Sequence, residues 1–319
     1  MHGWNHEMIC EDSNRQGVLI RTPFTTMMGI RYPIIGAPMF LVTTEELVVA
    51  VCNAGGLGTL PLPNYRTMEQ LKAALKRIHQ ETKMPIGINI HLSGRFPWKE
   101  QLRLCLDHGV RFFITVLGDP GLIVSDVHAQ GGKVFSSAIS LEHALKASEK
   151  GVDGIIAVGS GAGGHAGTIP IPILVPYLKE KTGLPIIAAG GISTGAQMAS
   201  AMAVGASAVV VGTRLIAAQE AGASDAYKRA VVEAGPEDII YTDRITGGHA
   251  NWLACSIANF QTQPSLSSKR WRDIWSAGQS VAQVKNMQPA AVIIQEIAEE
   301  YIRVCQDLQA TTIFVGNET

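Results

Sequence analysis

The chain has no excess of charge of either sign. Its 319 residues include 26 lysines and arginines against 27 aspartates and glutamates, a formal net charge of -1. Proteins that bind nucleic acid or anionic membranes carry basic patches or tails, so this balance argues against both kinds of partner. Charged residues are also few, at 17% against 46% hydrophobic residues. Such a composition buries a sizeable core, which excludes a disordered chain.

Cysteine is scarce, and long apolar runs are missing. The five cysteines are scattered and form no CxxC pair: Cys10, Cys52, Cys105, Cys255 and Cys305. This pattern argues against a disulfide framework or a zinc site and favours reduced thiols. No run approaches the ~18 apolar residues of a membrane span, and the first thirty residues carry charges where a signal peptide would be apolar. We therefore expect a cytoplasmic globular protein.

What the sequence does contain is an alternation of short apolar runs with longer amphipathic stretches. Stretches such as 44–53, 67–80 and 140–150 begin at Thr or Ser and predict helices. Runs rich in Ile, Val and Ala predict eight strands, over 33–37, 56–60, 85–90, 111–116, 133–137, 153–158, 185–189 and 207–212. Eight apolar strands alternating with helices predict an α/β fold, the (β/α)8 TIM barrel. The alternative, an open doubly wound sheet, usually carries GxGxxG at its first crossover, where this chain reads GAPMFLVT.

The composition changes after the eighth predicted strand, where turn-like clusters replace the regular alternation. We expect an N-terminal extension (1–30), the barrel (31–217), a small cap domain (218–270) and a C-terminal segment (271–319). The C-terminal segment contains an amphipathic helix over 289–306. It is expected to return to the barrel.

The positions just after the strands, where barrel enzymes place their active sites, are rich in glycine. Thirteen of the 33 glycines fall between Gly151 and Gly212. Ala188–Ile192 and Gly212–Thr213 suit phosphate binding, because glycine lets backbone N–H groups approach an anion closely. Tight turns between strand and helix would need the same glycines, and the sequence leaves both interpretations open. No Asp or Glu directly follows a strand, which disfavours a two-carboxylate glycosidase and an oxygen-ligand metal site.

His165 is the strongest acid–base candidate. Its loop also contains Gly159, Gly161, Gly163, Gly164 and Gly167. Such a loop buries little of itself, so its one ionisable side chain is placed to meet a ligand. Histidine, with a pKa near ~6.5, exchanges protons at physiological pH. A structural, hydrogen-bonded histidine is the competing interpretation, and His91 and His249 are weaker candidates.

Seven short motifs follow one another along nearly the whole chain. They are Pro33-Ile-Ile-Gly-Ala-Pro-Met39, Gly55-Gly-Leu-Gly-Thr59, Gly87-Ile-Asn-Ile90, Gly161-Ala-Gly-Gly-His-Ala-Gly167, Ala188-Ala-Gly-Gly-Ile192, Val211-Gly-Thr-Arg214 and Ser276-Ala-Gly-Gln-Ser280. Together they resemble the nitronate monooxygenase family, formerly called 2-nitropropane dioxygenases. The resemblance implies an FMN-dependent TIM barrel with a small second domain.

The resemblance also implies roles for individual residues. His165 matches the active-site histidine of the family. Gly190, Gly191, Gly212 and Thr213 would hold the FMN phosphate. Further flavin contacts are expected from Ala37, Pro38, Met39, Asn89, Lys133, Gly163, Gly164 and Gln279. Val158 and Gly161 stand where many members have Gln and Glu, which removes a glutamine that often contacts FMN.

The activity that the resemblance implies is the oxidation of alkyl nitronates, and of nitroalkanes, by FMN and molecular oxygen to a carbonyl compound and nitrite. The alternative is an NAD(P)H-dependent FMN reductase of quinones or enoyl thioesters. A flavoprotein without catalytic activity is the third interpretation. The expected partners are a small-molecule substrate and O2, with no nucleic acid, membrane or metal. A homodimer is compatible with the sequence, which leaves the oligomeric state and the physiological substrate open.

Overall fold

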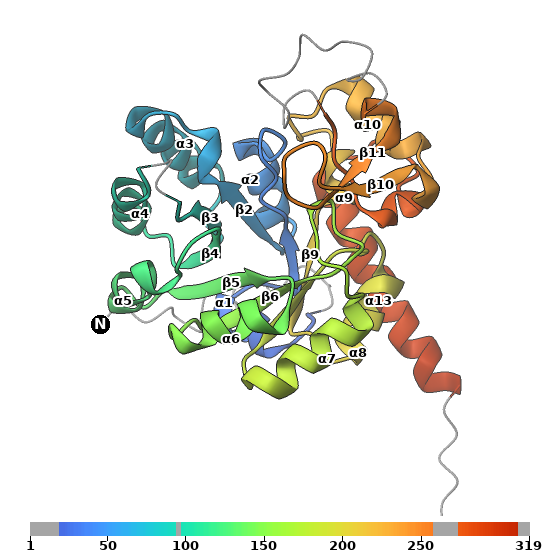
Figure 1. Ribbon diagram of the computed structural model, residues 1–319, viewed down its shortest axis with the longest axis horizontal. Coiled ribbons are helices and arrows are strands. Elements are labelled where there is room, and N and C mark those ends of the chain that lie inside the picture. Colours follow the sequence, from blue (N-terminus) through green and yellow to red (C-terminus); the bar gives the residue numbers. More distant parts are fainter. Residues whose placement is uncertain (1–18, 94–96, 258–273, 312–319) are drawn as a thin grey trace, which may run out of the picture.

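The eight expected strands form a closed parallel barrel. The computed structural model describes residues 19–93, 97–257 and 274–311. Within these ranges the barrel strands are β1 (Ile34–Gly36), β2 (Leu57–Pro61), β3 (Gly87–His91), β4 (Phe112–Val116), β5 (Lys133–Ala138), β6 (Gly154–Val158), β8 (Ile186–Ala189) and β9 (Ala208–Val211) (Figure 1). Parallel pairing of β1 with β9 closes the ring. The predicted TIM barrel is therefore confirmed.

Parts of three predicted segments lie outside the described residues. They are residues 1–18 of the N-terminal extension, including Cys10, residues 258–273 at the junction of the cap and the C-terminal segment, and residues 312–319. The short range 94–96 after β3 also lies outside them.

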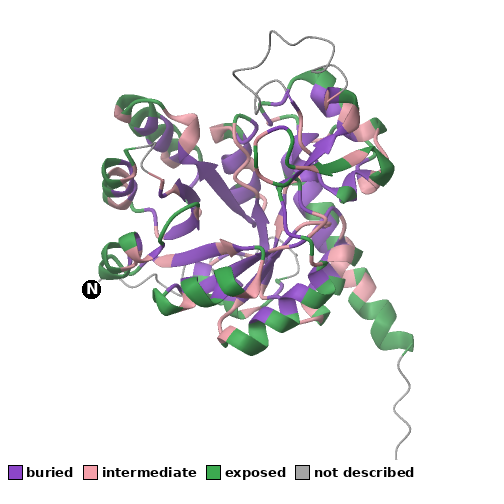
Figure 2. Cartoon of the chain, in the orientation of Figure 1, coloured by how far each residue is buried: buried purple, intermediate pink, exposed green. Residues whose placement is uncertain are grey.

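Helices cover the outside of the barrel (Figure 1). They are α2 (Glu45–Asn53), α3 (Met68–Glu81), α4 (Trp98–Asp107), α5 (Gly121–Ala129), α6 (Leu141–Glu149), α7 (Ile171–Thr182) and α8 (Gly195–Ala203), with a short 3-10 turn η2 (Leu62–Asn64) after β2. The hydroxyls of Thr44, Thr67 and Ser140 cap three of these helices, as the sequence predicts. Figure 2 shows the strands buried and the outer helix faces exposed, which explains the uniformly apolar strand sequences. No helix within the described ranges is long and apolar enough to cross a membrane.

Part of the expected N-terminal extension belongs to the core. Phe24, in α1 (Pro23–Met28), is 1% exposed. Its ring makes edge contacts with Phe112, 5.6 Å away between centroids, and with Phe135, 6.0 Å away. Phe112 is the first residue of β4. The phenylalanine ring of α1 therefore fills the end of the barrel at which the strands begin.

The eighth helix of the barrel is supplied by the C-terminal segment. β9 is followed only by the four-residue α9 (Thr213–Ile216), and α13 (Ala290–Thr311) packs against both α8 and α2. Ile293, Ile294 and Ile297 are buried on its inner face. The barrel thus includes residues beyond the predicted range 31–217, and the chain between α9 and α13 is an insertion after the last strand.

The described part of the insertion forms a small second layer, orange in Figure 1. It contains α10 (Asp225–Glu233), η3 (Pro236–Asp238), β10 (Ile239–Thr242), β11 (Ala250–Leu253) and η5 (Gln279–Gln283). Strands β10 and β11 form a sheet in the order β10-β11-β7 with β7 (Gly164–His165), which comes from the loop after β6. Two residues assigned to the barrel by sequence therefore belong to the sheet of the cap.

Candidate active site

A cavity of about 190 Å³ lies at the carboxyl ends of the barrel strands. Its walls come from strands β4, β5, β6, β8 and β9, from the segments that follow β1, β6, β8 and β9, and from residues 276–280. None of the described residues that line it has an ionisable carboxylate, amine, guanidinium or imidazole. An anion in this cavity would be held by backbone N–H groups and hydroxyls instead of by a cation.

Eight of the residues expected to contact a cofactor line this cavity. They are Ala37, Pro38, Met39, Gly163, Gly190, Gly191, Gly212 and Thr213. These residues are far apart in sequence, and they meet because every strand of a parallel barrel ends on the same side. The geometry makes them neighbours, whereas their contact with FMN stays a prediction.

Glycines in the cavity wall and beside it allow separate loops to pack backbone against backbone. A Cβ atom on Gly278 would overlap the carbonyl oxygen of Gly161, and one on Gly190 would lie 2.6 Å from the backbone nitrogen of Ala162. Gly190 also has a φ of 112°, which other residues rarely adopt. The wall itself therefore requires glycine, so the glycine-rich pattern does not depend on a ligand alone.

Three serines in the cavity wall were missed by the sequence analysis. Ser137, Ser276 and Ser280 line the cavity, and the hydroxyl of Ser193 donates to Ser280 Oγ at 2.8 Å. Ser276 and Ser280 flank the motif from which Gln279 was chosen, but the side chain of Gln279 is exposed and does not line the cavity. The motif Ser276–Ser280 was the available signal for two of these serines, of which Ser280 lies on η5 and Ser276 just before it.

Lys133 lies away from the cavity, which contradicts the flavin contact expected for it. It is the first residue of β5, at the end of the barrel where the strands begin. Its Nζ atom forms an ion pair of 2.9 Å with Asp153, whose carboxylate also accepts from the backbone of Val134 and pairs with His128.

Asn89 is buried inside the barrel, donates to the carbonyl of Ile114 at 3.3 Å and does not line the cavity either.

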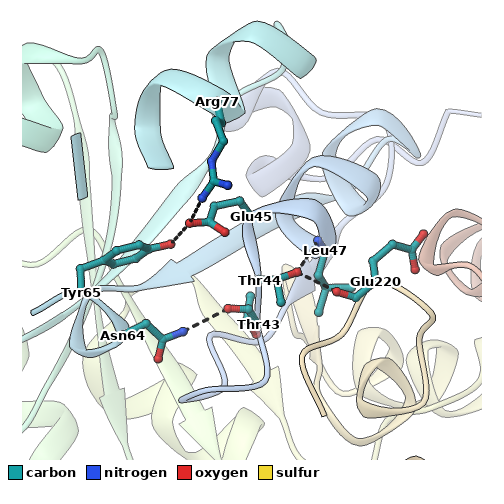
Figure 3. Close-up of polar contacts among 8 residues, drawn as sticks. All are labelled: Thr43, Thr44, Glu45, Leu47, Asn64, Tyr65, Arg77 and Glu220. Carbon is teal, nitrogen blue, oxygen red and sulfur yellow. Dashed lines mark hydrogen bonds and ion pairs between the residues drawn. The ribbon is translucent and has the colours of Figure 1, made fainter. Parts of the chain in front are cut away.

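The loop after β1, which brings Ala37 and Met39 to the cavity, is fixed by two polar side chains. Thr43 Oγ1 donates to the carbonyl of Ala37 at 2.8 Å and accepts from the backbone N–H of Met39 at 2.9 Å. The Asn64 amide donates to the carbonyl of Thr43 at 3.1 Å (Figure 3) and accepts from the N–H of Leu41 at 2.9 Å. Leu41 has a φ of 61°, so Asn64 holds the loop in a conformation that leucine adopts rarely.

The start of α2 ties the same loop to its surroundings. Thr44 Oγ1 donates to the carbonyl of Glu220, at the start of the insertion, at 2.7 Å. Glu45 accepts from the Tyr65 hydroxyl at 2.8 Å and from Arg77 at 3.0 Å (Figure 3). Burial, and then the Glu45 carboxylate, raise the pKa of Tyr65, so the phenol remains a donor. This side of the cavity is a fixed wall.

His165 lies beside the cavity wall, in the sheet of the cap. It follows Gly163, which lines the cavity, by two residues, and it pairs with Ala250 of β11. A Cβ atom on Gly248 would lie 3.2 Å from His165 Nε2, so the backbone at Gly248 packs on the imidazole ring. Burial of the ring lowers the pKa of His165 below its ordinary 6.5, although the residue as a whole is exposed. The ring is therefore neutral at physiological pH and can accept a proton.

Of the two weaker histidine candidates, His249 is the neighbour of Ala250, which pairs with His165, whereas His91 lies on a barrel strand. His249 stacks on Tyr241, with ring centroids 5.1 Å apart, and its Nε2 lies 4.0 Å from Asp243. His91 is the last residue of β3, and its Nδ1 lies 2.9 Å from the hydroxyl of Ser93. None of the three histidines, His165 included, is among the residues that line the cavity.

Comparison with known proteins agrees with this geometry. The sequence model of the nitronate monooxygenase family matches residues 21–101 and 93–268. A probable nitronate monooxygenase of Staphylococcus saprophyticus is 27% identical, over 86% of this chain and 96% of that protein. A Mycobacterium tuberculosis protein, named as a 5-hydroxy-7a-methyl-1-oxo-octahydro-1H-indene-4-carboxyl-CoA dehydrogenase, is 28% identical over 86% of this chain and 82% of that protein.

A solved structure shares the same fold over nearly the whole length. FabK from Thermotoga maritima superposes with a TM-score of 0.82 at 28% sequence identity, covering 92% of this chain and 100% of FabK. The relatives thus include more than one kind of oxidoreductase. Since the family model covers most of the described barrel and cap, this chain is an oxidoreductase that belongs to the nitronate monooxygenase family.

Proposed function

We propose that the chain binds FMN in the cavity and oxidises alkyl nitronates with molecular oxygen to a carbonyl compound and nitrite. One observation carries the proposal furthest. A single loop lines the cavity through Gly161 and Gly163 and, two residues later, presents His165. A cofactor site and an acid–base group are therefore adjacent in a chain of the nitronate monooxygenase family.

The chemistry of the cavity fits FMN. Ile114, Ile156 and Val210 offer apolar surface for a flat ring. The backbone N–H of Gly190 and the hydroxyl of Thr213 offer hydrogen-bond donors for a phosphate, whereas the N–H of Gly191 already donates to the carbonyl of Gly161. When bound, the flavin supplies the electron transfer that protein side chains cannot.

The protein groups bind and orient the substrate and move its proton. A neutral His165 can take a proton from the carbon next to the nitro group of a nitroalkane, or donate an N–H to a nitronate oxygen. The lowered pKa of His165 keeps the imidazole in the form that acts as a base. Gly248 packs on the ring and restricts where it points.

A second candidate function is an NAD(P)H-dependent reductase of enoyl thioesters or quinones. The similarity to a protein named as a carboxyl-CoA dehydrogenase favours it, because that name describes a thioester substrate. The nicotinamide would approach the flavin through the same opening as a nitronate. The two candidates therefore differ in the electron donor and not in the cofactor site.

The electron donor can be identified with FMN-loaded protein in the absence of oxygen. Mixing with propionate 3-nitronate should abolish the absorbance of the oxidised flavin, and mixing with NADH should leave it unchanged. Rapid loss of absorbance with NADH and none with nitronate would reverse the ranking. Purified protein that binds no FMN would contradict both candidates.

A further inference from the structure

Asn251 is a polar side chain buried inside the cap, and both hydrogens of its amide are used. It is the second residue of β11 and is 1% exposed. Its Nδ2 atom donates to the carbonyl of Ser160 at 2.8 Å and to the carbonyl of Ala162 at 2.7 Å. Both acceptors belong to the glycine loop after β6. One side chain of the cap is therefore hydrogen-bonded to the loop on both sides of Gly161.

The carbonyl between these two acceptors is held from other directions. Gly161 O accepts from the backbone N–H of Gly191 and from that of Gln279, each at 3.1 Å. Three consecutive carbonyls are thus satisfied by the cap, by the segment after β8 and by η5. Gly161 and Ala162 line the cavity, so these bonds fix the cavity wall itself.

The strand that contains Asn251 also pairs with the strand that carries His165. Asn251 pairs through its backbone with Gly164, and its neighbour Ala250 pairs with His165. The side chain of Asn251 therefore anchors residues 160–162, while its strand anchors residues 164–165. We propose that Asn251 is a positioning residue that fixes His165 relative to the cavity wall. This inference rests on the proposed function of His165.

The position requires an amide for a physical reason. Two carbonyl oxygens lie within 2.8 Å of Asn251 Nδ2, in a buried site where an unsatisfied acceptor is costly. Alanine offers neither donor. Serine offers one, so it can satisfy only one of the two carbonyls. The loop 160–162 should therefore be held less firmly with serine than with asparagine, and least firmly with alanine. A loss of side-chain volume alone would not predict this order.

The test compares Asn251→Ala and Asn251→Ser with the matched control Asn53→Ala. Asn53 also donates its amide to a backbone carbonyl, that of Glu81 at 3.3 Å, but on the exposed end of α2. The first measurement is hydrogen exchange of the FMN-bound protein, read on peptides covering 159–166 and, for comparison, the barrel strand 112–116. We expect Asn251→Ala to exchange at least tenfold faster in 159–166, Asn251→Ser to be intermediate, and the barrel strand to be unchanged.

The second measurement is steady-state oxidation of a neutral nitroalkane as a function of pH. We expect Asn251→Ala to lower kcat at least tenfold with less than a threefold change in KM, and to move the acidic limb of the pH profile toward pH ~6.5, the value of a solvated histidine. Exchange in 159–166 that matches wild type in both variants would overturn the inference. The inference would also be overturned if the pH profile of Asn251→Ala matched wild type and its kcat fell only in proportion to the fraction of protein that is unfolded.

These outcomes separate the inference from the proposed function. If the wild-type protein does not oxidise nitroalkanes or nitronates, the proposed function fails, and hydrogen exchange still decides whether Asn251 holds the loop. If the wild-type protein does oxidise them and Asn251→Ala has wild-type exchange and kinetics, only the inference about Asn251 fails.

Discussion

The backbone N–H of Gly278 donates a hydrogen bond of 2.9 Å to Thr213 Oγ1. Thr213 begins α9, two residues after the last barrel strand, and Gly278 lies near the end of the insertion, just before η5. The bond therefore joins the start of the insertion to its later part, beside the cavity that Thr213 lines. The Thr213 hydroxyl can therefore interact with two groups, the N–H of Gly278 and a ligand in the cavity. Its oxygen lone pair holds η5, and its hydroxyl hydrogen is available for a ligand.

Thr213→Val should therefore weaken both folding and cofactor binding. Valine has nearly the same shape but leaves a buried N–H without its acceptor, which costs about 1–3 kcal/mol. We expect the urea midpoint to fall and the dissociation constant for FMN, followed by flavin fluorescence, to rise about tenfold. Thr182→Val is the matched control, because Thr182 Oγ1 likewise accepts from a backbone N–H, that of Leu184 at 3.2 Å, but at the end of α7, away from the cavity. Equal FMN affinity in the two variants would contradict a role for Thr213 in the cavity.

Gly278→Ala should disturb the cavity wall far more than a glycine substitution elsewhere. A Cβ atom at this position overlaps the carbonyl oxygen of Gly161. Gly109→Ala is the control, since Gly109 has a φ of 80° but nothing within 4 Å of the added carbon. The control pays only the left-handed backbone cost of about 1–2 kcal/mol. We expect purified Gly278→Ala to contain little FMN and Gly109→Ala to contain the wild-type amount, measured by absorbance after denaturation.

The pH dependence of nitroalkane oxidation should follow the lowered pKa of His165. The neutral imidazole is the base, so kcat/KM should rise with pH and level off above the folded pKa, which lies below 6.5. His165→Asn should lower kcat/KM about 100-fold and remove the acidic limb of the profile. A limb that persists in the variant would assign it to another group.

The same shift predicts a direction for stability. Unfolded chains take up a proton on His165 near pH 6.5, whereas the folded protein resists protonation to a lower pH. The unfolded state therefore binds more protons as the pH falls below about 6.5, and this histidine makes the folded state progressively less stable there. Urea midpoints at a series of pH values should decline less steeply for His165→Asn than for wild type.

Arg214 should contribute more to stability than any surface ion pair. The residue is 8% exposed, and its guanidinium donates to Glu296 at 2.7 Å, to Gln288 at 2.9 Å and to the carbonyl of Gln283 at 2.9 Å. Arg214→Met leaves these acceptors without their donor, and we expect a loss of about 2–3 kcal/mol in the free energy of unfolding. Lys146→Ala, which removes an exposed pair with Glu142, should leave the urea midpoint unchanged.

The barrel was predictable because its strands are buried on both faces. The runs 111–116 and 153–158 are apolar apart from their charged first residues and Thr115, and the observed strands 112–116 and 154–158 differ from them by one residue. The contact expected for Lys133 did not rest on such a pattern. The flavin contact came from the family resemblance alone, although Lys133 begins the predicted strand 133–137 and so lies at the end of the barrel opposite the cavity. What only the tertiary fold shows is its partner, Asp153.

The cap was harder to predict, since its contacts depend on the tertiary fold. The sequence Gly164-His165 carries no strand signal, because two residues form a strand only when β11 pairs with them. Asn251 shows the same difficulty. Its importance comes from two backbone carbonyls about 90 residues earlier in the chain, and no spacing rule connects an asparagine with acceptors at that distance.

The use of the C-terminal helix as the eighth helix of the barrel has a consequence for biosynthesis. While the chain emerges from the ribosome, α2 and α8 are made long before α13, which is the element that covers them both. The inner faces of these helices stay uncovered until residues 290–298 have been released. Domains generally fold as units, so this barrel can close only after α13 has been synthesised. A nascent chain ending near residue 217 would therefore be a substrate for chaperones and not a folded barrel.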